Sequence, residues 1–445
     1  MTNLTTCIRA AAALLVLSLL MGCAVTEEKI ELWKGTKNGP KKLAAAAVNR
    51  ELPLDLRAKA IIALSEISDR DDENIWDLYI KSFEAMDKAD AAKVIETAAP
   101  MLAKKVETGV KGGVSKTQVS AKDALYIMYD FASGPGKEAV QNALIAWCTK
   151  DYNIRALAGK YNIRSIVKKV GAPGAEALIR LLNPNEVTIQ HVAELIREVG
   201  DKAVMEKASK ALAEQIDKNL AKLQEVHLIA AAIIGGKAIG KLLLKVAGNP
   251  DLAPELQRYA LRAYSEGITK ESIQADEGQI EDLFNIAENP KQDQYQREEA
   301  YYVIAQIGNK TAVPRLEKLL RNRDMFYRAV GLRCLLRLDG EHLLAKTLND
   351  IESSKKVSSE EEVDGIVERI TAFPPLLPKV RELLKSDSVF AAAVAVDVLR
   401  DMGVKDDLKL LKPLEKDERN LPKGFKHKKL QDAVKAAMDA IDQRG

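Results

Sequence analysis

The chain has 445 residues, of which 47% are hydrophobic, 29% are charged and only 5% are aromatic. Its 67 basic residues nearly balance its 64 acidic residues, so the composition gives no global attraction to nucleic acid or to an anionic membrane. No stretch alternates polar and apolar residues for long, and composition and period together therefore favour an all-helical chain.

The N-terminus has the organisation of a secretory signal. Arg9 supplies a positive charge, and an apolar stretch then runs over residues 10–21, which is too short to span a bilayer as a permanent helix. Leu20, Met21 and Gly22 come directly before Cys23. This Leu-x-Gly-Cys sequence resembles the lipobox of bacterial lipoproteins, so residues 1–22 are interpreted as a lipoprotein signal peptide.

The lipobox resemblance implies that Cys23 is lipidated and becomes the first mature residue. Several acyl chains on one cysteine anchor a protein far more firmly than one chain does. Ala24 replaces the aspartate that retains enterobacterial lipoproteins at the inner membrane, so we expect an outer-membrane anchor in the bacterial envelope, facing the periplasm. The alternative is an ordinary signal peptide, or an uncleaved anchor, that happens to contain a cysteine.

Residues 23–40 are predicted to be the lipidated cysteine and a short tether, because Gly, Thr, Asn and Pro are frequent there. If Cys7 leaves with the signal and Cys23 carries lipid, only Cys148 and Cys334 remain. Two distant cysteines cannot form a dense disulfide framework, and we expect both to be buried thiols.

Residues 57 to 437 repeat one helical pattern about twelve times. The clearest copies begin at Arg57, Arg155, Gln257, Arg297 and Arg328, each with a small or apolar residue three and six positions later. Weaker copies begin in the gaps, at Lys88, Lys122, Gln190, Glu225, Glu360, Ala392 and Leu430. A recurrence of this length is typical of helical solenoids, whose units must stack to complete a core. Each copy is predicted to be the second helix of a hairpin.

Turn and capping signals follow the same period. Asn-Pro pairs at 183–184, 249–250 and 289–290 each precede a second helix, as expected where proline ends a helix. Asp151, Asp293 and Asp324 each lie four residues before a repeat arginine, where they can cap a helix while the arginine reaches back or to the next unit.

The pattern Asp-x-x-x-Arg-x-x-Ala, with leucine-rich first helices, resembles the HEAT-repeat family, including HEAT-like repeats of bacterial proteins. The resemblance covers nearly all of the mature chain. It implies an all-α solenoid of about twelve stacked hairpins over residues 41–445, with an extended surface suited to protein binding. HEAT-like repeats also resemble parts of enzymes that attach or remove bilin pigments, and this enzyme class is the alternative.

The sequence offers no recognisable catalytic, cofactor or metal site. His191, His227, His342 and His427 lack partners at metal-ligand spacing. Glycine-rich stretches at 109–113 and 235–237 do not match phosphate-binding loops and are interpreted as helix breaks, and no Gly-x-Ser-x-Gly elbow occurs. We therefore expect a protein that is not an enzyme and needs no cofactor.

Helix geometry predicts where a partner would bind. If positions 0, 3, 6 and 7 of each second helix are buried, positions 1 and 5 lie on the opposite side and align between repeats. In the central repeats these positions hold a modestly basic strip with one aromatic residue: Arg258, Arg262, Glu298, Tyr302, Ala329 and Arg333. The strip is interpreted as a groove for a protein partner; the alternative is an ordinary solvated helix face.

Three further segments have simpler interpretations. Residues 106–122 and 265–282 interrupt the period and are either partner-contacting loops or tolerated surface loops. The basic cluster at Lys423 and residues 426–429 is interpreted as solvated capping of the last repeat, and export argues against a nucleic-acid partner. The favoured hypothesis is a non-catalytic, membrane-tethered scaffold or adaptor that holds a protein partner.

Overall fold

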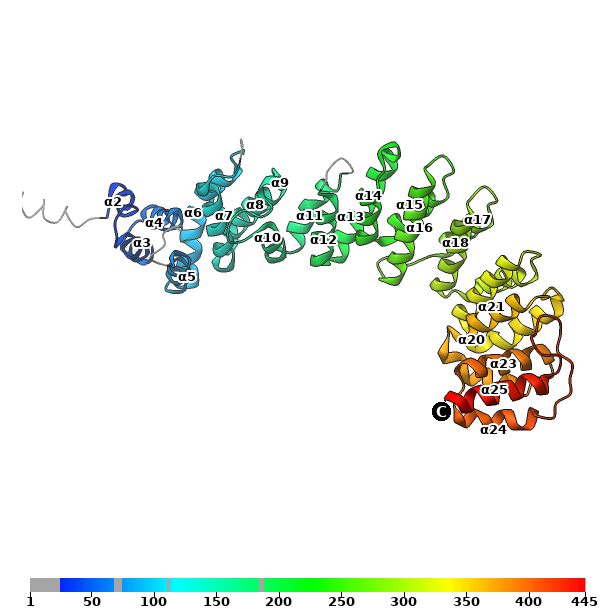
Figure 1. Ribbon diagram of the computed structural model, residues 1–445. Coiled ribbons are helices and arrows are strands. Elements are labelled where there is room, and N and C mark those ends of the chain that lie inside the picture. Colours follow the sequence, from blue (N-terminus) through cyan, green and yellow to red (C-terminus); the bar gives the residue numbers. More distant parts are fainter. Residues whose placement is uncertain (1–24, 68–73, 110–112, 184–187, 445) are drawn as a thin grey trace, which may run out of the picture. The chain divides into compact units, whose positions relative to one another are not determined.

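The computed structural model describes residues 25–67, 74–109, 113–183 and 188–444 (Figure 1). Within these ranges the chain forms 24 α-helices and seven short 3-10 segments, and no β-strand occurs there. The chain divides into two compact units, Met1–Gln215 and Ile216–Gly445, and the division falls inside α13 (Lys202–Lys218). Each unit is a stack of helical hairpins, which confirms the predicted all-α solenoid.

In the first unit, second helices of successive hairpins pack side by side. Before α13, its helices are α2 (Glu27–Trp33), α3 (Gly39–Val48), α4 (Leu54–Glu66), α5 (Ile75–Glu84), α6 (Lys88–Glu107), α7 (Lys116–Phe131), α8 (Gly134–Thr149), α9 (Tyr152–Arg155), α10 (Ile163–Val170), α11 (Ala172–Leu178) and α12 (Ile189–Val199). The second helices α4, α6 and α8 contact one another in that order.

The second unit continues this arrangement to the C-terminus. Its helices are α14 (Glu225–Ile234), α15 (Gly236–Ala247), α16 (Pro254–Thr269), α17 (Glu277–Glu288), α18 (Gln294–Ile307), α19 (Val313–Glu317), α20 (Met325–Ser354), α21 (Glu360–Thr371), α22 (Leu377–Leu383), α23 (Val389–Met402), α24 (Leu408–Leu411) and α25 (Leu430–Arg444). Helices α14, α16, α18, α20, α21, α23 and α25 form one row of neighbours. The backbone of Asp339 is non-helical, so α20 is kinked there and its two parts belong to successive hairpins.

Small residues three positions after the start of a repeat copy allow neighbouring helices to approach closely. Ala60, Ala260 and Ala300 have no exposed surface. At the equivalent Gly331, an added Cβ would lie only 2.8 Å from the Cβ of Leu319. Side chains larger than methyl at this position would separate the helices, because protein cores are close-packed. This result confirms the predicted buried arc in these four copies.

Two of the repeat arginines, Arg57 and Arg328, join successive hairpins. Arg57 donates from Nη1 and Nη2 to both carboxylate oxygens of Asp90 in the next hairpin, at 2.8 and 2.6 Å, and from Nε to the Ala47 carbonyl at 2.9 Å. Arg328 donates from Nε to Glu362 Oε1 in the next hairpin at 2.8 Å and from Nη1 to the Asn322 carbonyl at 2.8 Å. One guanidinium therefore satisfies carbonyls at the turn of its own hairpin and pairs with an acid of the next.

The aspartates that precede two of these arginines cap helices as predicted. Asp293 accepts a hydrogen bond from the backbone amide of Gln296 at 2.9 Å, and Asp324 accepts one from Phe326 at 2.9 Å. Each carboxylate satisfies an amide that has no partner within its helix. These caps fix where α18 and α20 begin.

The packed chain begins before the predicted boundary at residue 41. Helix α2 lies within the segment predicted to be a tether, and Thr26 caps it by accepting from the Lys29 amide. Ile30 is 1% exposed, and α2 contacts α3 and α4. The Gly39-Pro40 pair begins α3, because proline is tolerated in the first turn of a helix. Both residues are buried. The tether prediction is therefore wrong for residues 27–33 and 39–40.

Two predicted second helices are wrong, at Lys122 and Arg155. Lys122 lies inside α7, the first helix of its hairpin, because α8 is the helix that packs beside α6. Arg155 ends the four-residue α9, and Ala158 and Tyr161 follow it in non-helical backbone. Asp151 adopts left-handed backbone with φ of 50° and does not cap this helix through its side chain.

Buried side chains of α7 hold this non-helical segment. The Lys122 ammonium is fully buried, pairs with Asp123, and donates to the Ala158 carbonyl at 2.9 Å. Asp123 accepts from the backbone amides of Lys160 and Tyr161 at 3.0 and 3.1 Å. Buried polar groups whose hydrogen bonds are all satisfied stabilise one conformation, and here they hold residues 158–161 in a non-helical one.

The two predicted interruptions are shorter than expected. Helix α6 runs to Glu107 and α7 begins at Lys116, so only residues 108–115 separate them, of which 110–112 lie outside the described residues. Helix α16 continues to Thr269 and α17 begins at Glu277.

Cys148 and Cys334 are free and buried, as predicted, and burial raises the pKa of both thiols.

Ala300→Asp tests the repeat register. The substitution should place an unpaired charge between packed helices and destabilise the fold by several kcal/mol. Thermal unfolding followed by circular dichroism would measure the loss. Tyr295→Asp, at a 75% exposed position of the same helix, is the matched control and should leave the melting curve nearly unchanged. An unchanged melting curve for Ala300→Asp would contradict the register.

The Arg328–Glu362 pair tests the joining of hairpins. Both side chains are less than 10% exposed, so Arg328→Met leaves a buried carboxylate uncompensated and should cost about 3–5 kcal/mol. The double variant Arg328→Met/Glu362→Leu should cost clearly less than the two single losses combined. Urea denaturation of all four proteins measures this coupling. Additive losses would show that the two groups do not interact.

Asp397 should make stability depend on pH. Burial raises its pKa from 3.8 to about 6, while Arg400 and His427 act in the opposite direction. The folded protein then holds the Asp397 proton more tightly than the unfolded chain, so the free energy of unfolding falls as pH rises from about 4 to above 6.

Asp397→Asn should flatten this fall, because the variant has no proton to lose. Urea denaturation at several values between about pH 4 and pH 7 would measure it. The exposed Asp432→Asn on α25 is the control and should keep the wild-type slope. The same slope in Asp397→Asn and wild type would refute the assignment.

Candidate binding surface

The predicted strip lies on α16, α18 and α20 of the second unit. Arg258, Arg262 and Arg333 are exposed, whereas Glu298 and Tyr302 are half-buried. These helices are neighbours in the row of second helices, so the five residues share one face. Positions 1 and 5 are thus exposed on α16 and at Arg333, and half-buried on α18.

Contacts between repeats connect the strip. Arg258 Nε lies 3.1 Å from Asp293 Oδ2, at the start of the next second helix. The hydroxyl of Tyr302 donates to Glu298, and the Arg333 guanidinium lies 4.3 Å from the centre of the Tyr302 ring. Burial, then the bond to Glu298, raises the pKa of Tyr302 to about 12, so the phenol stays protonated. The side chains are therefore positioned across hairpins.

A cavity of about 550 Å³ opens beside this strip, between α16 and α18. Of the predicted residues, it is lined by Arg258, Arg262, Glu298 and Tyr302. It also brings in residues that the sequence reasoning missed: Glu255, Tyr259, Leu261, Tyr295, Gln296 and Glu299. The added glutamates make the surface mixed in charge, and it is less basic than the strip alone predicted.

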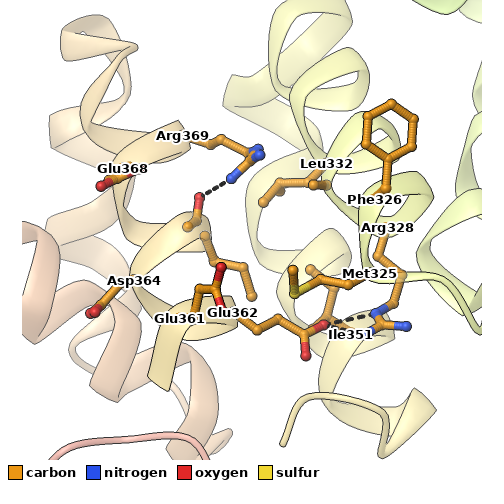
Figure 2. Close-up of a pocket in the computed structure, with 13 residues that line it drawn as sticks. Met325, Phe326, Arg328, Leu332, Ile351, Glu361, Glu362, Asp364, Glu368 and Arg369 are labelled. Atoms are coloured by element: carbon orange, nitrogen blue, oxygen red, sulfur yellow. Dashed lines mark hydrogen bonds and ion pairs between the residues drawn. The ribbon is translucent and has the colours of Figure 1, made fainter. Parts of the chain in front are cut away.

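A second cavity, of about 600 Å³, lies between α20 and α21 (Figure 2). Met325 and Phe326 supply apolar surface from α20, and the buried Leu332 and Ile366 lie behind them. Four carboxylates line it as well, from Glu361, Glu362, Asp364 and Glu368. Figure 2 shows the ion pair between Arg328 and Glu362 at this cavity. Sequence reasoning missed it because the copy at Glu360 is weak.

The histidines of the described residues have structural surroundings. His227 is buried, and its Nδ1 accepts from the Gln224 amide at 3.0 Å. His342 Nδ1 lies 2.7 Å from Asp339 at the kink of α20. Across the part of the chain that the structure describes, no group of three or more His, Cys, Asp or Glu side chains could hold a metal ion.

The N-terminal signal residues Leu20, Met21, Gly22 and Cys23 lie outside the described residues. Among the helices that are described, none combines the length and the apolar character needed to cross a bilayer. The lipid attachment at Cys23 therefore stays a prediction.

Comparisons with known proteins give low similarity. No family model matches the chain, and no curated protein matches it. Among solved structures, an engineered protein is 16% identical, with 94% of this chain and 99% of that chain covered and a TM-score of 0.21. The RNA-binding domain of yeast Puf5p bound to AAT2 RNA is 14% identical, with 85% and 98% covered and a TM-score of 0.35.

A chain from a structure of the cadherin and beta-catenin interaction is 11% identical, with 94% of this chain and 99% of that chain covered and a TM-score of 0.27. Similarity at this level carries no argument about function. The solenoid assignment rests on the helices and contacts of this chain itself, and the binding surface must be judged on its own chemistry.

Proposed function

We propose that this protein is a non-catalytic scaffold of HEAT-like repeats that binds a protein partner through the strip on α16, α18 and α20. The observation that carries the proposal is the alignment of exposed Arg258, Arg262 and Arg333 with Tyr302 across three successive hairpins, beside a cavity of about 550 Å³. Arginine and tyrosine are the residue types that most often dominate the energy of protein interfaces.

The charge distribution favours a protein over a nucleic acid. Arg258 is paired with Asp293, and the cavity is also lined by Glu255, Glu298 and Glu299. Phosphate backbones are bound by several basic side chains whose charge is not already neutralised. A mixed surface with tyrosines suits a polypeptide, which offers charges of both signs, amides and apolar side chains.

Prearranged side chains support this use of the strip. Arg333 stacks on Tyr302, which in turn bonds to Glu298, so part of the rotamer freedom of these residues is already lost in the free protein. Ordering side chains is one of the costs of association, and side chains that are already held reduce that cost.

We further propose that the scaffold is anchored by lipid on Cys23 to the periplasmic side of the bacterial outer membrane. The support is the Leu20-Met21-Gly22-Cys23 sequence after a short apolar stretch, together with Ala24. An anchor of this kind would concentrate the partner near the membrane without contributing to the binding surface.

Crosslinking in intact cells, affinity purification and mass spectrometry would test the function. Arg258→Glu/Arg262→Glu should reduce recovery of the partner about tenfold or more, because two exposed contacts reverse charge. Lys241→Glu/Lys245→Glu, which line a cavity between α15 and α17 on the first-helix side, is the matched control and should keep wild-type recovery.

Cys23→Ser separates anchoring from recognition. It should release the protein from the membrane fraction while the purified variant still binds the partner. Equal recovery with the strip variant and its control would refute the binding surface. A pigment or other small molecule that copurifies in place of a protein would favour the bilin-lyase alternative.

A further inference from the structure

The cavity between α20 and α21 is more acidic than the one beside the predicted strip, whose two arginines and three glutamates give its lining a net charge of −1. Its four carboxylates face two guanidinium groups, from Arg328 and Arg369, so the lining carries a net charge of −2. The buried pair of Arg328 with Glu362 is internally neutral. Glu361, Asp364 and Glu368 remain exposed. These three carboxylates are available to a ligand, whereas the paired one is not.

The cavity also offers apolar surface of a kind suited to binding. Met325 is 41% exposed although it is a large hydrophobic residue, and Phe326 and Leu332 lie beside it. Figure 2 shows Met325, Phe326 and Leu332 on α20 with Glu361 and Glu362 of α21 across from them, whereas Asp364 and Glu368 lie on the outer side of α21. Methionine adapts its shape to varied partners, so this floor suits apolar side chains of different sizes.

Arg369 has a partner on its own helix. Its Nη1 donates to the Gly365 carbonyl one turn earlier, at 2.6 Å. Gly365 makes this fold-back possible, because an added Cβ would lie only 2.8 Å from that nitrogen. Held in this way, Arg369 leaves the carboxylates of Glu361 and Asp364 without a salt bridge among the described residues.

The chain's own C-terminal segment packs against the start of α21. Residues 415–429, between α24 and α25, contain a lysine-rich cluster and no long helix. Within the segment, Gly424 lies against the Ser359 carbonyl and Val363 of α21, and the Phe425 ring packs edge-on against Phe390 of α23, with centres 5.5 Å apart. A non-helical segment of the chain with an aromatic residue thus packs beside α21 and α23.

We propose that the cavity between α20 and α21 binds a basic, extended segment of a protein partner, with lysine or arginine flanking an apolar anchor. The anchor would occupy the floor at Met325 and Phe326, and the flanking cations would meet Glu361, Asp364 and Glu368. The inference rests on the proposed function, since it assumes that the partner is a protein. It adds a second, more acidic contact in the same row.

Fluorescence anisotropy with purified full-length protein tests the inference. The probe is a labelled seven-residue peptide, Lys-Leu-Lys-Phe-Lys-Leu-Lys, and the comparison peptide carries glutamate at every lysine position. The basic peptide should bind and the acidic one should not. Preference for the acidic peptide, or no binding of either, would overturn the proposal.

Charge removal locates the binding site. Glu361→Gln/Asp364→Asn/Glu368→Gln should weaken binding of the basic peptide about tenfold or more, because three exposed charge contacts are lost together. Glu225→Gln/Glu277→Gln/Asp282→Asn removes three exposed carboxylates elsewhere in the second unit and should retain wild-type affinity. Equal loss in both variants would show nonspecific attraction and overturn the site.

Filling the cavity separates docking from adsorption. Ala329→Trp places a large ring in the lining without changing charge and should also weaken binding severalfold. Wild-type affinity in this variant would overturn the apolar anchor. These peptide measurements do not depend on the strip variant. If the peptide does not bind, the proposed function still stands. If Arg258→Glu/Arg262→Glu keeps wild-type recovery of the partner, the peptide measurements still test the α20–α21 cavity.

Discussion

The buried guanidinium of the repeat arginine fixes how one hairpin stacks on the next at Arg57 and Arg328. Arg57 and Arg328 each bond to carbonyls of their own hairpin and to an acid of the next one, Asp90 or Glu362. Apolar faces alone would allow neighbouring hairpins to slide, since hydrophobic contact is not directional. A planar guanidinium with fixed donors specifies one offset between the two hairpins that it joins.

The repeat period predicted the helices, their buried face and the exposed strip because those features repeat. Ala60, Ala260 and Ala300 are buried at the same position, and the caps at Asp293 and Asp324 follow the motif. The segment after α8 departs from the period for a local reason. Lys122 and Asp123 bind the backbone of residues 158–161, which lie 36 to 39 positions later. These hydrogen bonds are not part of the repeat motif, so the motif could not predict them.

The cavities could be predicted only in part. Helix geometry predicted four residues of the first cavity: Arg258, Arg262, Glu298 and Tyr302. It did not predict Tyr259 and Tyr295, which line the same cavity but are not at positions 1 and 5 of their repeats. A cavity depends on the separation between helices, which the packing of side chains decides. The same limit hid the α20–α21 cavity, because Met325 and Phe326 precede the repeat arginine and the motif begins after them.

Charge varies along this row of second helices, and that variation constrains any partner. The lining beside the strip holds two arginines and three glutamates, a net charge of −1, and the α20–α21 lining carries a net charge of −2. An acidic partner segment would meet like charges at the α20–α21 cavity, which disfavours it there more strongly than beside the arginines of the strip. The row of second helices therefore supplies the spacing between the two surfaces, and their exposed charges constrain which partner segment each one accepts.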